Sequence, residues 1–133
     1  MIIDELGLFS NDQAITATAA SEDTVDLSVA RDIGPGEPLP LNIQVTEAFN
    51  NLTSLKVAVE EDDNSAFSSA VEVVSATLLL ADLVVGARFP IHYAPRNSER
   101  HMRLYYTVVG TAPTTGKIHA GFQTGDQTNK ANV

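Results

Sequence analysis

The chain has 133 residues, of which 44% are apolar and 19% charged, and its net charge is −9. This length is typical of one domain, and the apolar content is enough for a buried core, so the composition excludes an intrinsically disordered chain. The chain has no cysteine, which excludes disulfides, thiolate metal sites and cysteine nucleophiles, and its acidic balance makes nucleic acid and anionic membranes poor partners.

Residues 1–12 are predicted to form an N-terminal arm or a short turn. Residues 6–9 could make one helical turn, and Ser10 or Asn11 would then open a loop. Ile2, Ile3, Leu6, Leu8 and Phe9 are too many apolar residues for a free terminus, so we expect them to pack under the domain or against a partner. The start of the chain is acidic where an export signal would be basic, so we expect a protein made in the cytoplasm without export.

Several short segments place apolar residues at alternate positions, which is typical of strands that bury one face. In chain order they are residues 24–28, then Leu39, Leu41, Ile43 and Val45, then Leu55, Val57 and Val59, then Phe89 and Ile91, then Leu104, Tyr106 and Val108, and finally Ile118, Ala120 and Phe122. Turn residues separate these segments at 34–38, 62–65, 94–98 and 110–113. The pattern predicts one all-β domain over residues 1–133, an antiparallel β-sandwich or jelly roll with little helix.

Three segments do not follow the alternating pattern. Residues 14–20 could be strand or helix, and their threonines favour a strand. Residues 76–85 are apolar almost throughout, so periodicity does not decide between strand and loop. Residues 125–133 are polar, and we expect a frayed tail.

The residues that could carry chemistry are dispersed. His92, His101 and His119 do not pair at a spacing that would bring metal ligands together. Ser98 and His101 with some acid could be called a triad, but no Gly-x-Ser-x-Gly turn supports it. The carboxylate run at 60–64 lacks the spacing of a calcium loop, which favours a solvated hairpin turn. The sequence therefore predicts no catalytic residue, no cofactor, no metal and no enzymatic activity.

The charges are unevenly distributed along the chain. Residues 1–72 hold 14 acidic and two basic residues, a net charge of −12, whereas residues 73–133 hold three acidic and six basic residues, a net charge of +3. Arg96, Arg100 and Arg103 concentrate positive charge near one predicted loop. They could dock on an acidic partner or be balanced by nearby carboxylates, and the sequence leaves both interpretations open.

The order of several segments resembles one known family. These segments are residues 1–6 (MIIDEL), 9–21 (FSNDQAITATAAS), 25–27 (VDL), 30–34 (ARDIG), 36–39 (GEPL), 62–69 (DDNSAFSS) and 99–106 (ERHMRLYY). Together they look like the Bbp16-type capsid cement, or decoration, proteins of tailed bacteriophages, from residue 1 to about residue 124. The resemblance implies a jelly-roll protein of the virion that binds the major capsid protein on the outside of an HK97-like shell and clamps neighbouring subunits. It also implies a symmetric homodimer or homotrimer.

The family pattern assigns no contact residues, so we infer two groups from the chain itself. The first group is the apolar residues Ile2, Ile3, Leu6 and Phe9, and the second is Arg96, Arg100 and Arg103. The long turn from Glu60 to Ser69 is expected to project at one end of the domain.

Two other classes of function compete with the cement interpretation. The first is a carbohydrate- or ligand-binding β-sandwich module of a phage tail or host-surface protein. Its aromatic content of 6% counts against it, and Tyr93, Tyr105 and Tyr106 together on one concave face would support it. The second is an enzyme, which would need a pocket where His92 or His101 meets an acid.

Overall fold

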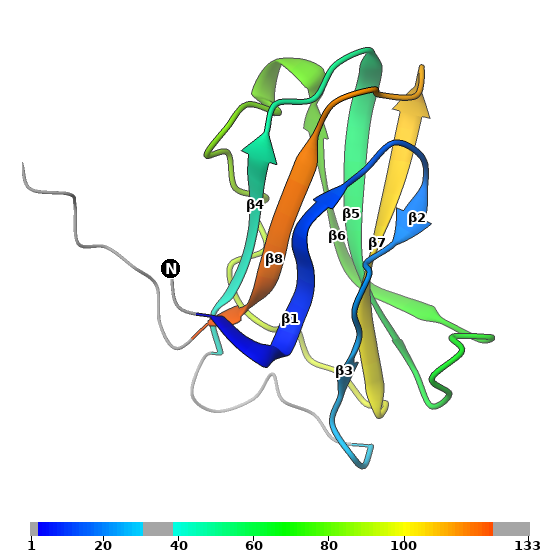
Figure 1. Ribbon diagram of the computed structural model, residues 1–133. Coiled ribbons are helices and arrows are strands. Elements are labelled where there is room, and N and C mark those ends of the chain that lie inside the picture. The colour runs from blue at the N-terminus through cyan, green and yellow to red at the C-terminus, as the bar shows by residue number, and fades with distance from the viewer. Residues whose placement is uncertain (1–2, 31–38, 124–133) are drawn as a thin grey trace, which may run out of the picture.

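The computed structural model describes residues 3–30 and 39–123, whose antiparallel strands form two packed sheets (Figure 1). One sheet has the order β1 (Ile3–Ala14), β8 (Lys117–Gln123), β4 (Leu41–Glu47). The other has the order β2 (Ala19–Ala20), β7 (His101–Gly110), β5 (Leu52–Asp62), β6 (Val71–Leu79), and β3 (Val25–Asp26) also pairs with β7. Helix is limited, in the described ranges, to the 3₁₀ turn η1 (Leu80–Asp82). The prediction of an all-β antiparallel sandwich with little helix is confirmed.

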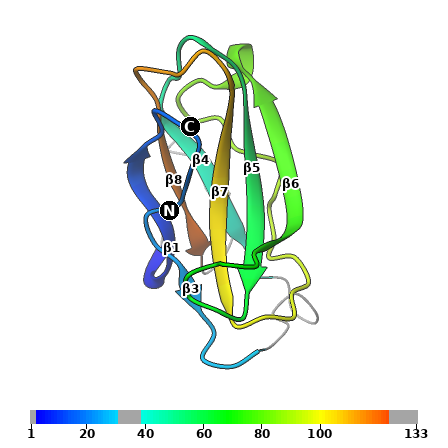
Figure 2. The ribbon, with the colours of Figure 1, turned by 90° about the vertical axis from the view of Figure 1, so that its right-hand side faces the viewer.

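The core lies between the two sheets, which Figure 2 shows edge-on as two layers. Alternate residues of each long strand point into it, because successive side chains of a strand point to opposite faces. The fully buried ones are Leu41, Ile43 and Val45 of β4, Leu55, Val57 and Val59 of β5, Met102, Leu104 and Tyr106 of β7, and Ile118 and Ala120 of β8. Burial of each large side chain contributes about 1.5–3 kcal/mol, which makes these rows the main source of stability.

The prediction of an arm or helical turn at the N-terminus is wrong. Residues 3–14 form β1, which pairs with β8 and is interrupted by three shifts of register. Because of these irregularities, the neighbouring residues Phe9 and Ser10 are both fully buried. The ring of Phe9 packs edge-on against Phe122 at 5.3 Å, so this residue belongs to the core.

Residues 14–20 contain parts of two strands, and residues 76–85 contain a strand followed by a turn. Ala14 ends β1, and β2 begins at Ala19 after a turn, so the strand prediction for this segment is right only at its ends. The undecided segment 76–85 is strand to Leu79 and then passes through η1.

The alternating pair Phe89 and Ile91 lies in segment 86–94, which runs along the outer edge of β4. It makes only two isolated bridges, Gln44 with Arg88 and Pro40 with Tyr93, so the predicted strand is present in irregular form. The predicted turn at 34–38 and the tail at 125–133 lie outside the described residues, as does Ile2.

Candidate partner-binding surface

Arg103, on β7, is held inside the fold by a carboxylate and two aromatic rings. Its Nε donates to Glu60 Oε2 of β5 at 2.7 Å, and both side chains are largely buried. Its guanidinium lies 4.4 Å from the centre of the Phe67 ring and 5.2 Å from that of Tyr105, which is cation–π contact distance. Arg103 therefore stabilises the domain and is not displayed for a partner.

Arg100 is exposed but already bound to a carboxylate of the same chain. Its Nε and one terminal nitrogen donate to the two oxygens of Asp26 at 2.7 and 2.9 Å, with each side chain about half exposed. The hydrogen bond from Arg100, helped by the backbone N–H of Ser28, holds the pKa of the Asp26 carboxyl well below its usual range. The carboxylate raises the pKa of Arg100 in turn.

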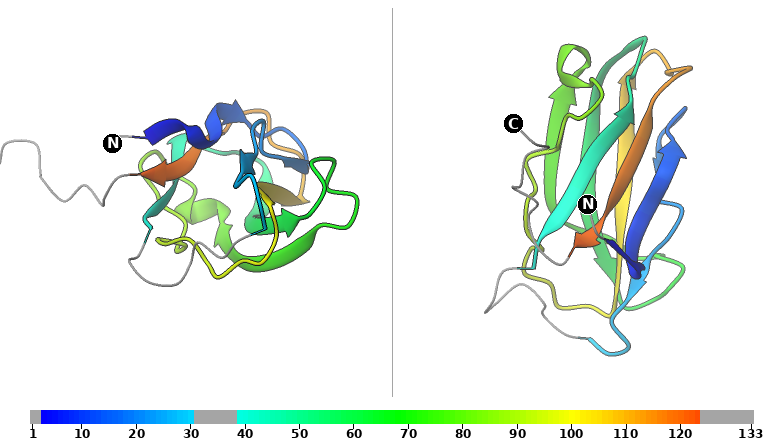
Figure 3. Two further views of the ribbon diagram at one scale, coloured as in Figure 1. Left: turned by 90° about the horizontal axis from the view of Figure 1, so that it is seen from below. Right: turned by 60° about the vertical axis from the view of Figure 1, so that its left-hand side comes forward.

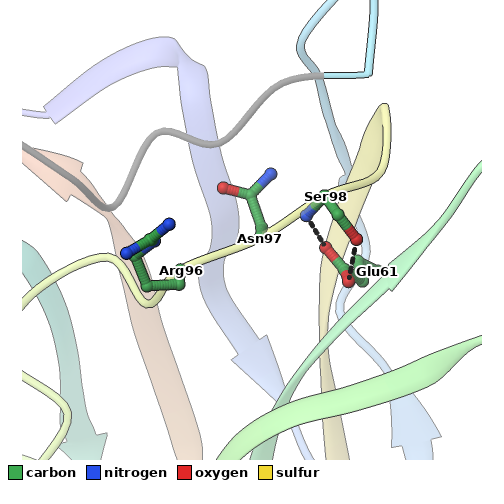
Figure 4. A pocket seen from close by; sticks show the side chains of 4 residues that line it. All are labelled: Glu61, Arg96, Asn97 and Ser98. Atoms are coloured by element: carbon green, nitrogen blue, oxygen red, sulfur yellow. Dashed lines mark hydrogen bonds between the residues drawn. The ribbon is translucent and has the colours of Figure 1, made fainter.

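Arg96 lies at a shallow pocket with Asn97, Ser98 and Glu61 (Figure 4). Glu61, on β5, is buried and accepts hydrogen bonds from the Ser98 backbone at 2.8 Å and the Ser98 hydroxyl at 3.1 Å, and also from the Glu99 backbone at 3.2 Å. These bonds tie the loop before β7 to the end of β5. Arg96 is exposed, and Figure 4 shows its side chain directed away from Glu61.

The carboxylate run at 60–64 leads into the hairpin connection between β5 and β6, as the sequence favoured, but it is only partly solvated. Asp63 and Asn64 are exposed, whereas Glu61 and Asp62 are buried. Asp62 is only 2% exposed and accepts hydrogen bonds from the backbone of Asn64, the backbone of Ser69 and the Ser69 hydroxyl. Burial alone would raise its pKa, but these bonds and one from Asp63 lower the pKa of Asp62 to about 2, and the bond to Asp62 raises the pKa of Asp63.

The turn that follows this run was expected to project at one end of the domain, but its central residue is packed against β7. Phe67, at its centre, is buried against Arg103 and His101. The turn is thereby packed back onto the outer side of β7.

The contacts of the histidines and of Ser98 are as follows. Nδ1 of His101 lies 4.0 Å from Asp26, and Nδ1 of His119 lies 3.8 Å from Asp12. His92 is exposed in segment 86–94, and Ser98 donates to Glu61. In the described ranges, no three His, Asp or Glu side chains are grouped as a metal site requires.

The three tyrosines do not share a face. The ring of Tyr106 is fully buried between the sheets, and its hydroxyl lies 2.7 Å from Ser10 Oγ. Tyr105, its neighbour on β7, points to the other side of the sheet, next to Arg103. Tyr93 is 51% exposed on segment 86–94.

Sequence reasoning missed an apolar surface along and beyond β6. Val71, Leu79, Val84 and Val85 are each more than half exposed, and Leu6 on β1 is 84% exposed. The signal for this surface was the apolar run of residues 71–85, which periodicity did not resolve into strand and loop. Of the predicted apolar contact group, Leu6 is therefore accessible and Phe9 is not.

No helix of the described residues has the length and apolarity needed to cross a membrane.

Comparison with known proteins identifies the family. No curated protein matches the chain. The family model Bbp16 matches residues 9–122, which run from within β1 to within β8. The chain therefore belongs to the Bbp16 family, which is associated with bacteriophages.

Proposed function

We propose that this protein is a capsid cement protein, which binds the outer surface of an HK97-like phage shell and clamps neighbouring major capsid subunits. The observation that carries the proposal is membership of the Bbp16 family over nearly the whole folded part of the chain. Packaged DNA pushes the shell outward, and a protein bound across the seams adds contacts that resist separation. Each contact can be weak, because many copies act together on a repeating lattice.

The strand order supports a jelly roll as the scaffold for this role. Jelly rolls have eight strands in two sheets. The first sheet has four members when segment 86–94 is counted beside β1, β8 and β4. The second sheet also has four when β2 and β3, which both pair with β7, are counted as one interrupted strand beside β7, β5 and β6. The chain passes from one sheet to the other between β1 and β2, between β3 and β4, and again between β4 and β5. Such a scaffold presents a rigid surface to the shell.

The accessible residues narrow the expected contact surface. Arg96 and Arg100 are exposed, as is Leu6, whereas Phe9 and Arg103 are used inside the fold. We assign Arg96 and Arg100 to attachment, with acidic groups of the major capsid protein as their partners. For Arg100 this means exchanging Asp26 for a carboxylate of the shell. A bidentate bond to the new carboxylate replaces the one that is lost, and solvent screens the exposed pair.

The mechanism needs binding and no chemistry. We assign the protein no catalytic group, cofactor or metal. The separation of Tyr93, Tyr105 and Tyr106 removes the feature that would have supported a sugar-binding face.

Co-sedimentation with shells that lack the protein tests the proposal. Purified protein should pellet with such shells and should show no binding to a glycan array. The charge-reversed variant Arg100→Glu should bind less, and the difference should shrink as added salt screens the charges.

Lys117→Glu is the matched control for this variant. Lys117, the first residue of β8, forms a similarly exposed ion pair with Glu47, the last residue of β4. Figure 1 shows the start of β8 and the end of β4 at the opposite end of the sandwich from the start of β7, so the reversal of Lys117 should leave attachment unchanged. Failure of the wild-type protein to pellet with shells, or specific binding to a glycan, would overturn the proposal.

A further inference from the structure

A groove of about 360 Å³ opens between β1 and β3, where an edge of one sheet lies beside an edge of the other. Figure 3 shows these two strands next to one another. The backbone N–H of Asp23 donates to Phe9 O at 3.0 Å and ties the chain before β3 to β1. The groove is lined by Leu6 of β1 and, in and just before β3, by Asp23, Thr24 and Asp26.

Leu6 gives the groove an apolar wall. It lies between Ile3 and Leu8, where the pairing of β1 with β8 shifts in register, and it is 84% exposed. A side chain that fills the groove would cover Leu6, and the burial of apolar surface favours binding.

The rest of the groove is polar and carries negative charge. Asp23 and Asp26 are both exposed. Asp26 binds Arg100 through both of its oxygens, whereas the Asp23 carboxylate forms no ion pair with residues 3–30 or 39–123. Within those ranges, no basic side chain lines the groove. The free protein therefore has one carboxylate here without a cationic partner.

Attachment through Arg100 would leave a second carboxylate without a partner. In the proposed function, Arg100 exchanges Asp26 for a carboxylate of the shell. The Ser28 backbone N–H donates to Asp26 Oδ1 at 2.8 Å and holds this carboxylate in place. An aspartate is ionised at neutral pH even without an arginine beside it. On the shell, the groove would then hold two negative charges, those of Asp23 and Asp26.

We propose that this groove binds a lysine or arginine side chain of the major capsid protein, next to the site where Arg100 attaches. The inference rests on the proposed cement function and adds the chemistry of the partner surface. A basic side chain has an apolar stem, which fits against Leu6, and a cationic head, which fits the carboxylates of Asp23 and Asp26. An acidic side chain would be repelled, and an apolar one would cover Asp23 without giving it a partner. One ion pair within the free chain is replaced by two between the chain and the shell.

Changing the charge of Asp23 separates this inference from attachment by arginines alone. If the shell offered only carboxylates to this end of the domain, Asp23→Asn would remove a repulsion and bind more tightly, and Asp23→Lys would bind more tightly still. A basic side chain in the groove reverses the order. Asp23→Asn should bind about two- to fivefold more weakly than wild type, and Asp23→Lys more weakly again.

Co-sedimentation with shells that lack the protein, over a range of protein concentration, measures these affinities. Glu99→Gln is the control for charge, because Glu99 is next to Arg100 in the chain but does not line the groove. It should bind as tightly as wild type or more tightly. Thermal melts check that each variant keeps its fold, as expected for the exposed residue Asp23.

A second variant tests the apolar wall without changing any charge. Leu6→Ala should bind shells at least about twofold more weakly than wild type, because the stem of the basic side chain loses its apolar contact. Val29→Ala is the matched control. Val29 is 54% exposed and follows β3 closely in the chain, but it does not line the groove, so its replacement should leave the affinity unchanged.

Two results would overturn the proposal: Asp23 variants that bind shells as tightly as wild type or more tightly, or a Leu6→Ala variant that binds as wild type does. Both leave the cement function standing as long as the wild-type protein pellets with shells. A wild-type protein that does not pellet would refute the cement function itself, and the occupant of the groove with it.

Discussion

The buried hydroxyl of Ser10 on β1 joins the two sheets through Tyr106 of β7. It donates its only proton to Gln13 Oε1 at 2.7 Å, so the Tyr106 hydroxyl, 2.7 Å away, must be the donor in the bond between Ser10 and Tyr106. Burial raises the pKa of the Tyr106 hydroxyl, although the bond to Ser10 opposes the shift. This hydroxyl therefore stays protonated at neutral pH and donates to Ser10.

This direction of donation predicts unequal effects for two substitutions. Ser10→Ala leaves the buried Tyr106 hydroxyl without its acceptor and should lower the free energy of unfolding by about 1–3 kcal/mol. Tyr106→Phe leaves Ser10 bonded to Gln13 and should cost about 1 kcal/mol or less. Chemical denaturation of both variants measures the difference, and a larger loss for Tyr106→Phe would contradict the assigned donor.

Asp62 should make stability depend on pH. Its pKa in the folded protein, about 2, lies below the ordinary value of 3.8, so its stabilising contribution is present above that ordinary value and is lost as the pH falls from about 4 towards 2. Asp62→Asn should lower the melting temperature at pH 7 and reduce the further loss in this acidic window. Thermal melts across pH 2–7 test this.

The neighbouring residue Asp63 provides the control. Its pKa is raised, so loss of its charge should leave the melting temperature of Asp63→Asn at pH 7 equal to or above that of wild type. If Asp62→Asn and wild type melt alike at every pH, the hydrogen bonds of Asp62 do not stabilise the turn.

At the scale of the elements, alternation predicted the strands that are central or well paired. β4, β5, β7 and β8 each bury one row of apolar residues, which appears in the sequence as period two. β1 was missed because its bulges bury Phe9 and Ser10 together. β6 was undecided because an edge strand with both faces partly exposed can carry apolar residues at almost every position.

The candidate site was predictable only in part. The sequence placed Arg96, Arg100 and Arg103 together, but it could not show that Glu60 and Asp26, more than 40 residues away, would pair with two of them. Pairing between distant segments depends on sheet register, which a local pattern does not contain.

The turn between β7 and β8 depends on a glycine for two reasons. Gly116 has a φ of +131°, and a Cβ there would lie 2.3 Å from the Phe49 ring. Gly116→Ala should therefore cost about 1–2 kcal/mol for the backbone and about 1–3 kcal/mol more for the clash.

Gly86→Ala is the matched control for Gly116→Ala. Gly86 also has a positive φ, +90°, but open space surrounds its Cβ position, so only the backbone penalty applies. Equal destabilisation of the two variants would show that Phe49 can move aside. Denaturant midpoints measure both.

At the scale of the whole molecule, three ion pairs join the basic half of the chain to the acidic half. Arg100, Arg103 and Lys117 come from the basic half, and they pair with Asp26, Glu60 and Glu47 of the acidic half. The fold interleaves the halves, so the split along the sequence does not by itself create an acidic and a basic face.

Arg103 and Arg100 differ in how deeply their ion pairs are buried, so their charge reversals should have different effects. Arg103→Glu places two carboxylates together in a largely buried site beside Phe67 and should lower the melting temperature strongly. Arg100→Glu affects an exposed pair, so its melting temperature should change little while attachment to shells weakens. Melting curves and co-sedimentation of the two variants, measured side by side, test this; equal melting temperatures would contradict the structural role of Arg103.

The most direct test of the cement function is the stability of DNA-filled particles with and without this protein. Particles that lack it should assemble but release DNA at a lower temperature, or after milder osmotic shock, than complete particles. Adding the purified wild-type protein back should restore the higher release temperature. Particles that are equally robust with and without the protein would contradict the account.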